Sequence, residues 1–357
     1  MTGKGKNGIR RLWAELVLAF AIPLFFLLTS VPTGFVLEGP GPSFDLQAEL
    51  TVEGTETHVP RGEFLLTSVS LRESNLVYQL LSSVRRDNLL IEVRRFLGEE
   101  LDLQAQDRVD GILTVLSQET AAVLALRRAG LEVEVKELGA LVLGVAEGSP
   151  AQGKLGPGQV IVSVDGVPVK GGAELGERIA SSGEEVILGI GEVDWEALES
   201  SLQRGENPDP EELLAGGTRE IALYPAWDPE LGRKAVGVYT RDYFTHRSPV
   251  RITWRMESVR GPSAGLMMTL SLLNLLLPED LTRGMKVAGT GEVFLDGRVG
   301  AIGGLPMKIR AAERQGAEVF LYPRDNQDDL AGVDTRMRLV PVGSLEEALA
   351  FLSSQEE

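Results

Sequence analysis

The sequence predicts an α+β protein that is divided into several parts and preceded by one apolar N-terminal helix. Three observations lead to this fold class: an uncharged stretch near the N-terminus, strand patterns punctuated by glycine in the middle of the chain, and helical patterns on both sides of them. The chain has 357 residues, 43% of them hydrophobic, which is enough for two or three packed domains. It contains no cysteine, so disulfides, a thiol nucleophile and cysteine metal sites are excluded.

The first predicted element is a membrane anchor. Residues 16–37 carry no charge, and a stretch of that length can span a hydrocarbon core at about 1.5 Å per residue. Basic residues precede it, so we expect a cytoplasmic N-terminus over 1–11, a transmembrane anchor over 12–37 and an extracytoplasmic remainder. A cleaved signal peptide is the alternative, because residues 29–34 are small. No Ala-x-Ala site occurs there, which favours a retained anchor.

A stalk and then a strand-and-helix region follow the anchor. Residues 38–61 begin with a Gly/Pro-rich string and predict the stalk. Residues 62–71 have the pattern of a strand, and 74–84 that of a helix capped by serine. A second helix is predicted from Asp107 to the glycine at 130.

The middle of the chain has the pattern of a small β module. Gly156 and Gly158 turn the chain into a buried strand, and Asp165-Gly166 is typical of a two-residue hairpin turn. Residues 173–181 predict a short helix. For any one of these strings, ordinary β-turns in a small domain are a sufficient explanation.

Taken together, these strings resemble a PDZ domain of the bacterial protease type, extending over 131–225. The strings that carry the resemblance are 138–142, 148–151 and 155–169. A PDZ domain adds a peptide as an extra strand and holds its C-terminal carboxylate on backbone N–H groups. The resemblance implies that the loop for this carboxylate consists of Leu138, Gly139, Ala140 and Leu141. An acidic insertion at about 191–217 interrupts the last strands, and we expect it to be a solvated flap.

A serine in the C-terminal part has the surroundings of a nucleophile. Ser263 follows Gly261 and Pro262, which predict a turn, and Ala264 begins an apolar helical run. We therefore expect Ser263 at the N-terminus of a buried helix. There, free backbone N–H groups and the helix dipole would lie beside its oxygen, where an oxyanion forms.

A lysine further along the chain could serve as the base that this serine needs. Lys308 comes just after Pro306, which predicts the first turn of a second helix. The positive helix end and burial both disfavour the ammonium form, so we expect a neutral amine. A serine hydroxyl needs such a base to become nucleophilic. Each motif alone is ordinary, because Gly-Pro-Ser turns and lysines in first turns are common.

In combination, the strings resemble the proteolytic domain of the Lon family. Its signature appears here as Gly-Pro-Ser-Ala-Gly (261–265), Thr-Gly-Glu (290–292) and Ile-Gly-Gly (302–304), followed by the lysine. The resemblance implies that Ser263 is the nucleophile and Lys308 the general base, with Thr290 supporting the lysine by a hydrogen bond. Arg260 departs from the pattern, because many Lon domains have aspartate there and many membrane-anchored relatives have glycine.

The resemblance extends from about residue 30 to 350, to the PDZ-containing, membrane-anchored Lon-like peptidases of bacteria. It implies a Lon-type proteolytic domain whose first part covers 62–130 and whose catalytic part covers 235–355, split by the PDZ domain. The implied activity is that of a serine endopeptidase at the outer face of the cytoplasmic membrane, with the PDZ domain recognising substrate C-termini. No Gly-x-x-x-x-Gly-Lys-Ser/Thr string occurs, so we expect it to act without ATP.

The expected partners are unfolded proteins or peptides, the membrane and, because Lon domains form rings, further copies of the chain. No cofactor or metal site is expected. The net charge of −17 argues against nucleic-acid binding.

Three alternatives remain open. A catalytically inert PDZ scaffold would bind peptides without cutting them, and a small-molecule amide hydrolase could use the same serine and lysine. A Ser-His-Asp triad would need His58 or His246, the two histidines of the chain. Neither lies in a string typical of a base, and we expect His246 in a loop before a strand at 250–254.

Overall fold

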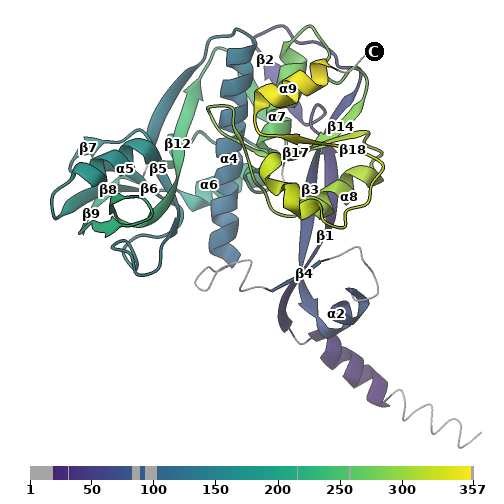
Figure 1. The fold of residues 1–357 in the computed structure, drawn as a ribbon, viewed down its shortest axis with the longest axis horizontal. Coiled ribbons are helices and arrows are strands. Elements are labelled where there is room, and N and C mark those ends of the chain that lie inside the picture. Colours follow the sequence, from purple (N-terminus) through teal and green to yellow (C-terminus); the bar gives the residue numbers. More distant parts are fainter. Residues whose placement is uncertain are drawn as a thin grey trace, which may run out of the picture. The chain divides into compact units, whose positions relative to one another are not determined.

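The computed structural model describes residues 19–30, 32–82, 89–92, 103–214, 216–256 and 259–354. The chain divides into two compact units. The smaller consists of residues 1–42 and 69–101, and the larger of 43–68 and 102–357. Helices and strands are mixed in the larger unit, which confirms the predicted α+β character (Figure 1).

The smaller unit contains a helix over Ala19–Ser30 whose side chains are mostly exposed. Phe20 is 77% and Phe26 71% exposed. Strand β1 (Pro32–Asp45) begins two residues after the helix, and its first half pairs antiparallel with β4 (Leu89–Glu92). The end of β3 (Glu63–Asn75) leads into α2 (Leu76–Ser82), which matches the helix predicted from residue 74.

Two predicted boundaries near the N-terminus are wrong. The anchor expected over 12–37 is not helical to its end, because residues 32–37 lie in β1. Its first residues, 12–18, and the basic segment 1–11 lie outside the described residues. The stalk expected over 38–61 is also partly regular, because it contains the rest of β1 and all of β2 (Leu50–Glu53).

Helix α4 (Leu103–Arg128) is the one described helix that is long and apolar enough to cross a membrane. Over its apolar stretch, however, 83% of the residues are buried inside the protein. Its composition is thus explained by packing, because a helix that is covered on all sides is apolar all round. In Figure 1 it runs between the sheet that holds β5 and β12 and the sheet that holds β14 and β17.

A parallel sheet organises the catalytic side of the larger unit. Its strands lie in the order β18 (Arg338–Val342), β17 (Val319–Pro323), β14 (Lys286–Gly289) and β3. Alternate residues face opposite sides: Val319 and Leu321 belong to one hydrophobic cluster, and Phe320 to another. The first cluster includes α7 (Gly265–Leu276) and α9 (Leu345–Ser353), and the second includes α8 (Leu305–Arg314). Helices α7 and α8 therefore cover opposite faces of one sheet.

The β module forms a second sheet in the same unit. Its order is β12 (Val238–Arg247), β5 (Glu134–Val145), β6 (Gln159–Val164), β8 (Val186–Glu192) and β9 (Thr218–Leu223), with the short β7 (Val167–Pro168) paired to β6. One face packs on α5 (Gly172–Ser181), as Ala140 and Val142 show, and the other faces α4, as Leu141 shows. The hairpin turn predicted at Asp165-Gly166 is confirmed, because both residues have positive φ angles (49° and 75°), as a type I′ turn requires.

The insertion at 191–217 is not a solvated flap, so that prediction is wrong. It forms α6 (Trp195–Gln203) and a short 3₁₀ turn (Glu212–Leu214). The side chains of Leu198, Leu202 and Leu213 are buried in the cluster that joins the β module to α4. The insertion therefore contributes to the core.

Candidate active site

Ser263 lies in a 3₁₀ turn (Pro262–Ala264) directly before α7. The turn starts at Gly261, whose φ of 93° is strained for any residue with a Cβ. The Gly261 N–H donates to the carbonyl oxygen of Asp110 at 3.0 Å and to Oγ1 of Thr114 at 2.8 Å. Helix α4 thus holds the turn through two acceptors, while Ser263 itself stays partly exposed.

Lys308 lies in the first turn of α8, after the left-handed Gly304 and Pro306. Only 4% of Lys308 is exposed. Its Nζ lies 2.6 Å from Oγ of Ser263 and 3.1 Å from Oγ1 of Thr290. Helix α7, which follows Ser263, and helix α8, which carries Lys308, cover opposite faces of the sheet. The first turns of both helices lie at the carboxyl end of β14, and the two side chains meet there.

Thr290 directly follows β14 and contacts both the side chain of Lys308 and the backbone of Ser263. It is fully buried, and its Oγ1 donates to the backbone oxygen of Ser263 at 3.1 Å. The next residue, Gly291, donates its N–H to the same oxygen at 2.9 Å and accepts from the N–H of Leu266 at 3.0 Å. The Thr-Gly pair thereby fixes the serine turn from the side opposite α4.

The structure brings together Ser263, Lys308 and Thr290, with Gly261, Pro262 and Ala264 shaping the serine turn. The loop expected for His246 is wrong: this residue lies in β12, with Nδ1 at 2.8 Å from Oε2 of Glu119. Among the described residues, no group of three or more His, Asp or Glu side chains is placed to hold a metal ion.

Asp110 carries a half-buried carboxyl group beside the serine turn, and the sequence did not single it out. Burial raises its pKa to about 6, and the negative charge of Asp107 acts in the same direction, against a hydrogen bond from Gln106. Its Oδ1 lies close to where a Cβ on Gly261 would be, at 3.9 Å. The signal in the sequence was an aspartate three residues after another, directly before the apolar run 111–116 of the same helix.

This carboxyl group should make stability fall as the pH rises. The folded pKa of about 6 lies above the ordinary 3.8, so the folded protein binds the proton more tightly than the unfolded chain. The resulting stabilisation is complete below about pH 4 and is lost by about pH 6 to 7, by on the order of 1–2 kcal/mol after solvent screening. Urea unfolding of Asp110→Asn should lack this decrease, whereas the exposed Asp325→Asn should retain it. An equal decrease in wild type and Asp110→Asn would contradict the assignment.

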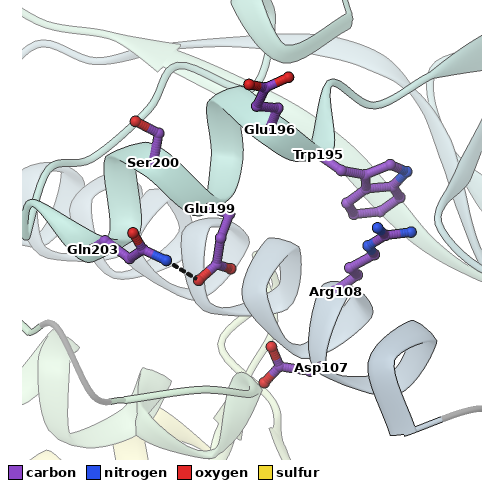
Figure 2. Close-up of a pocket in the computed structure, with 7 residues that line it drawn as sticks. All are labelled: Asp107, Arg108, Trp195, Glu196, Glu199, Ser200 and Gln203. Atoms are coloured by element: carbon purple, nitrogen blue, oxygen red, sulfur yellow. Dashed lines mark hydrogen bonds between the residues drawn. The ribbon is translucent and has the colours of Figure 1, made fainter.

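Arg260, the departure from the Lon pattern, contacts the insertion. Its Nη2 lies 3.4 Å from Oε1 of Glu199 in α6. Next to this contact, α6 and the start of α4 line a groove of ≈ 650 Å³. Figure 2 shows Arg108 beneath the ring of Trp195 and Glu199 hydrogen-bonded to Gln203. The insertion therefore borders the approach to the serine turn.

The carboxylate loop expected at Leu138, Gly139, Ala140 and Leu141 is wrong. All four residues lie in β5, which pairs with β12 on one side and with β6 on the other. Gly139, Ala140 and Leu141 pair with β12, and Ala140 and Leu141 also pair with β6, so these residues form part of the sheet rather than a loop. A groove of ≈ 370 Å³ lies elsewhere on the module, between α5 and residues 228–240. Strand β12 is at the edge of its sheet there.

The β module resembles solved PDZ domains only distantly. The PDZ domain of an SdrC-like protein from Listeria monocytogenes is 19% identical, covers 30% of this chain and 92% of its own, and gives a TM-score of 0.22. The PDZ domain of a similar SdrC-like protein from Listeria innocua is 23% identical. It covers 29% of this chain and 93% of its own, and gives a TM-score of 0.21. TM-scores this low do not establish the fold of the module.

The segment that carries the serine and lysine matches known proteases in sequence. Residues 257–352 match the model of the Lon protease (S16) C-terminal proteolytic domain. Lon protease of Xanthomonas oryzae is 42% identical over 93 residues, which are 25% of this chain and 11% of that protein. Lon protease of Chloroflexus aggregans is 39% identical over 98 residues, which are 26% of this chain and 12% of that protein. The chain thus spans about an eighth of these relatives' length, and its residues 257–352 are similar to the C-terminal proteolytic domain of Lon proteases.

Proposed function

We propose that this protein is a serine endopeptidase in which Ser263 is the nucleophile and Lys308 the general base. The observation that carries this proposal is the 2.6 Å separation of Oγ and Nζ, within hydrogen-bond reach, in a segment of the Lon proteolytic type. Burial of Lys308 disfavours its charged form and so favours the neutral amine that can accept a proton.

In the first step Ser263 Oγ attacks the scissile carbonyl while its proton passes to Nζ of Lys308. Lys308 then gives this proton to the leaving amine, and an acyl-enzyme remains on Ser263. Water repeats the sequence: it gives a proton to the lysine, attacks the ester, and releases the acid and the free serine. The backbone N–H groups of Ser263 and Ala264 stand in the first helical turn, where amides have no acceptor within the helix, and they would hold the oxyanion.

The absence of a phosphate-binding string supports action without ATP. Without an unfolding motor, the enzyme would depend on chains that are already unfolded or that present a free end. We assign recognition of such ends to the groove beside α5, because the edge of β12 can accept a peptide as an added strand in the manner of PDZ domains. Further copies of the chain are proposed partners by the resemblance to ring-forming Lon domains.

We also propose that the protein is anchored in the cytoplasmic membrane with its catalytic side outside. Support comes from the exposed apolar side chains of the helix over Ala19–Ser30 and from the basic residues that precede it in the sequence. The described part of this helix is shorter than the about 20 residues that a span needs, whereas the uncharged stretch of the sequence at 16–37 is long enough. Membrane fractionation tests the anchoring, and the protein should be found with the membranes. Protease digestion of intact spheroplasts tests the orientation, and the catalytic part should be digested from outside.

The test of the activity is cleavage of unfolded casein by the full-length protein without ATP. Wild type should cleave, and Ser263→Ala should not. Ser271→Ala is the matched control, because this buried serine lies in the same helix and its hydroxyl has no hydrogen-bond partner. Cleavage that persists in Ser263→Ala would remove this serine from the mechanism. If wild type binds peptides without cutting them, the protein is the inert PDZ scaffold instead.

A further inference from the structure

We propose that Arg241, on a strand of the β module, is a positioning residue for the Ser263–Lys308 pair. It would act by holding β15 (Glu292–Val293), the strand that continues directly from the Thr-Gly pair beside the catalytic groups. The expected effect of Arg241 on turnover rests on the peptidase function proposed above, whereas its effect on the position of β15 does not.

Three contacts fix the Arg241 guanidinium on β15. Nη1 donates to Oε1 of Glu292 at 2.5 Å, and Nη2 donates to the backbone oxygen of Val293 at 2.9 Å. The guanidinium also lies over the ring of Phe294, 4.1 Å from its centroid. A planar guanidinium with two donors in use fixes orientation as well as distance.

The contact is largely buried, so solvent and salt screen it less than they screen a surface ion pair. Arg241 is 9% exposed, and the side chain of Glu292 is 20% exposed. Burial lowers the pKa of Arg241, and the negative charge of Glu292 opposes that shift. Removing one partner would leave the other as a buried charge with its main partner gone, which is costly.

Strand β15 in turn holds the serine turn. Gly291, one residue before it, donates to the backbone oxygen of Ser263. Val293 packs against the first residue of α7, where a Cβ on Gly265 would approach its Cγ1 to 2.9 Å. A displacement of β15 therefore moves both the support of Ser263 and Thr290, which contacts Lys308.

The pairing register of β12 with β5 determines that the side chain of Arg241 points toward β15. The pairing of β12 with β5 shifts between Tyr239 and Thr240, as in a β-bulge. After the shift Arg241 pairs with Leu141, whose side chain faces α4, so Arg241 points to the same side. Thr240, by contrast, lies on the α5 side, where it lines the groove. The strand that borders the groove thus also carries the contact to β15.

The test compares Arg241→Met with Arg298→Met. Arg298 stacks on the other side of Phe294, at 4.6 Å, but its charge pairs with Asp296 rather than with β15. For Arg241→Met we expect kcat on casein-derived peptides to fall about 10-fold with KM changed less than threefold. Amide hydrogen exchange in residues 289–293 should become faster, while that of α9 stays unchanged. Arg298→Met should match wild type in kcat, in KM and in the amide hydrogen exchange of residues 289–293.

Glu292→Gln provides the second variant, because it removes the charge and keeps the shape. It should lower kcat in the same way, and the double variant with Arg241→Met should lose no more than either alone. Wild-type kcat in Arg241→Met, or lost kcat with unchanged exchange in 289–293, would overturn the proposal. If wild type cleaves nothing, the proposed activity fails, and the exchange comparison alone still decides whether Arg241 holds β15.

Discussion

Replacing Lys308 by alanine is expected to lower kcat by about 10³-fold or more, to the level of Ser263→Ala. In the proposed mechanism the neutral amine takes the serine proton, and general bases contribute about 10²- to 10⁴-fold. Residues that act as a unit are also strongly non-additive. The double variant Ser263→Ala/Lys308→Ala should therefore lose no more activity than either single variant. Steady-state kinetics with a quenched fluorescent peptide measures this.

Binding and folding should survive this change. The amine contacts Ser263 and Thr290 and leaves the groove beside α5 untouched, so peptide affinity measured by fluorescence anisotropy should stay within about threefold. Lys286→Ala is the matched control, because Lys286 begins the strand that leads to Thr290 but pairs with Glu63 at 2.9 Å. It should cleave at the wild-type rate. Appreciable turnover by Lys308→Ala would assign the base to another group.

The sequence predicted those parts of the site that local chain geometry determines. The Gly-Pro turn places Ser263 before α7, and Pro306 places Lys308 in the first turn of α8. That the two side chains meet could not be derived from local pattern. It follows from two crossovers that place α7 and α8 on opposite faces of one parallel sheet, with both of their first turns at the end of β14.

Long-range packing explains what the sequence predicted wrongly. Gly139 and Leu141 were assigned to a ligand-binding loop from a short string, but pairing with strand β12, about a hundred residues later, makes them part of a strand inside the sheet. The acidic surface of the insertion suggested a flap, yet the leucines of α6 at helical spacing are buried against α4. In both cases the partner is distant in the chain, so no local window contains the deciding contact.

The same limit applies to the residues that the sequence did not single out. Arg241 and Asp110 are polar residues within a strand and a long helix. Arg241 is buried against β15 and Asp110 is half-buried beside the serine turn, and in each case the contacting segment comes from another part of the chain. Such residues become visible only when the fold places a turn or strand against them.

Replacing Thr290 by valine is the second change with a large expected effect, about 10- to 100-fold in kcat. Valine has the shape of threonine but cannot accept from Nζ of Lys308 or donate to the backbone oxygen of Ser263. Thr290 is fully buried, so water cannot replace these two hydrogen bonds, although the Ser263 oxygen keeps its bond from the Gly291 N–H and Lys308 Nζ keeps its contact with Ser263 Oγ. Losing hydrogen bonds under those conditions costs on the order of 1–3 kcal/mol, which gives the stated factor.

The variant Thr290→Ser distinguishes the contribution of the hydroxyl group from that of the methyl group. Serine retains the oxygen, so its kcat should stay within about threefold of wild type, although the lost methyl group costs about 1 kcal/mol of stability. If the hydroxyl positions Lys308, Thr290→Val loses kcat while its KM remains near that of wild type and the protein stays folded at the assay temperature. Equal activity of the valine and serine variants would contradict a role for the hydroxyl, because the two differ in the one group that contacts the lysine.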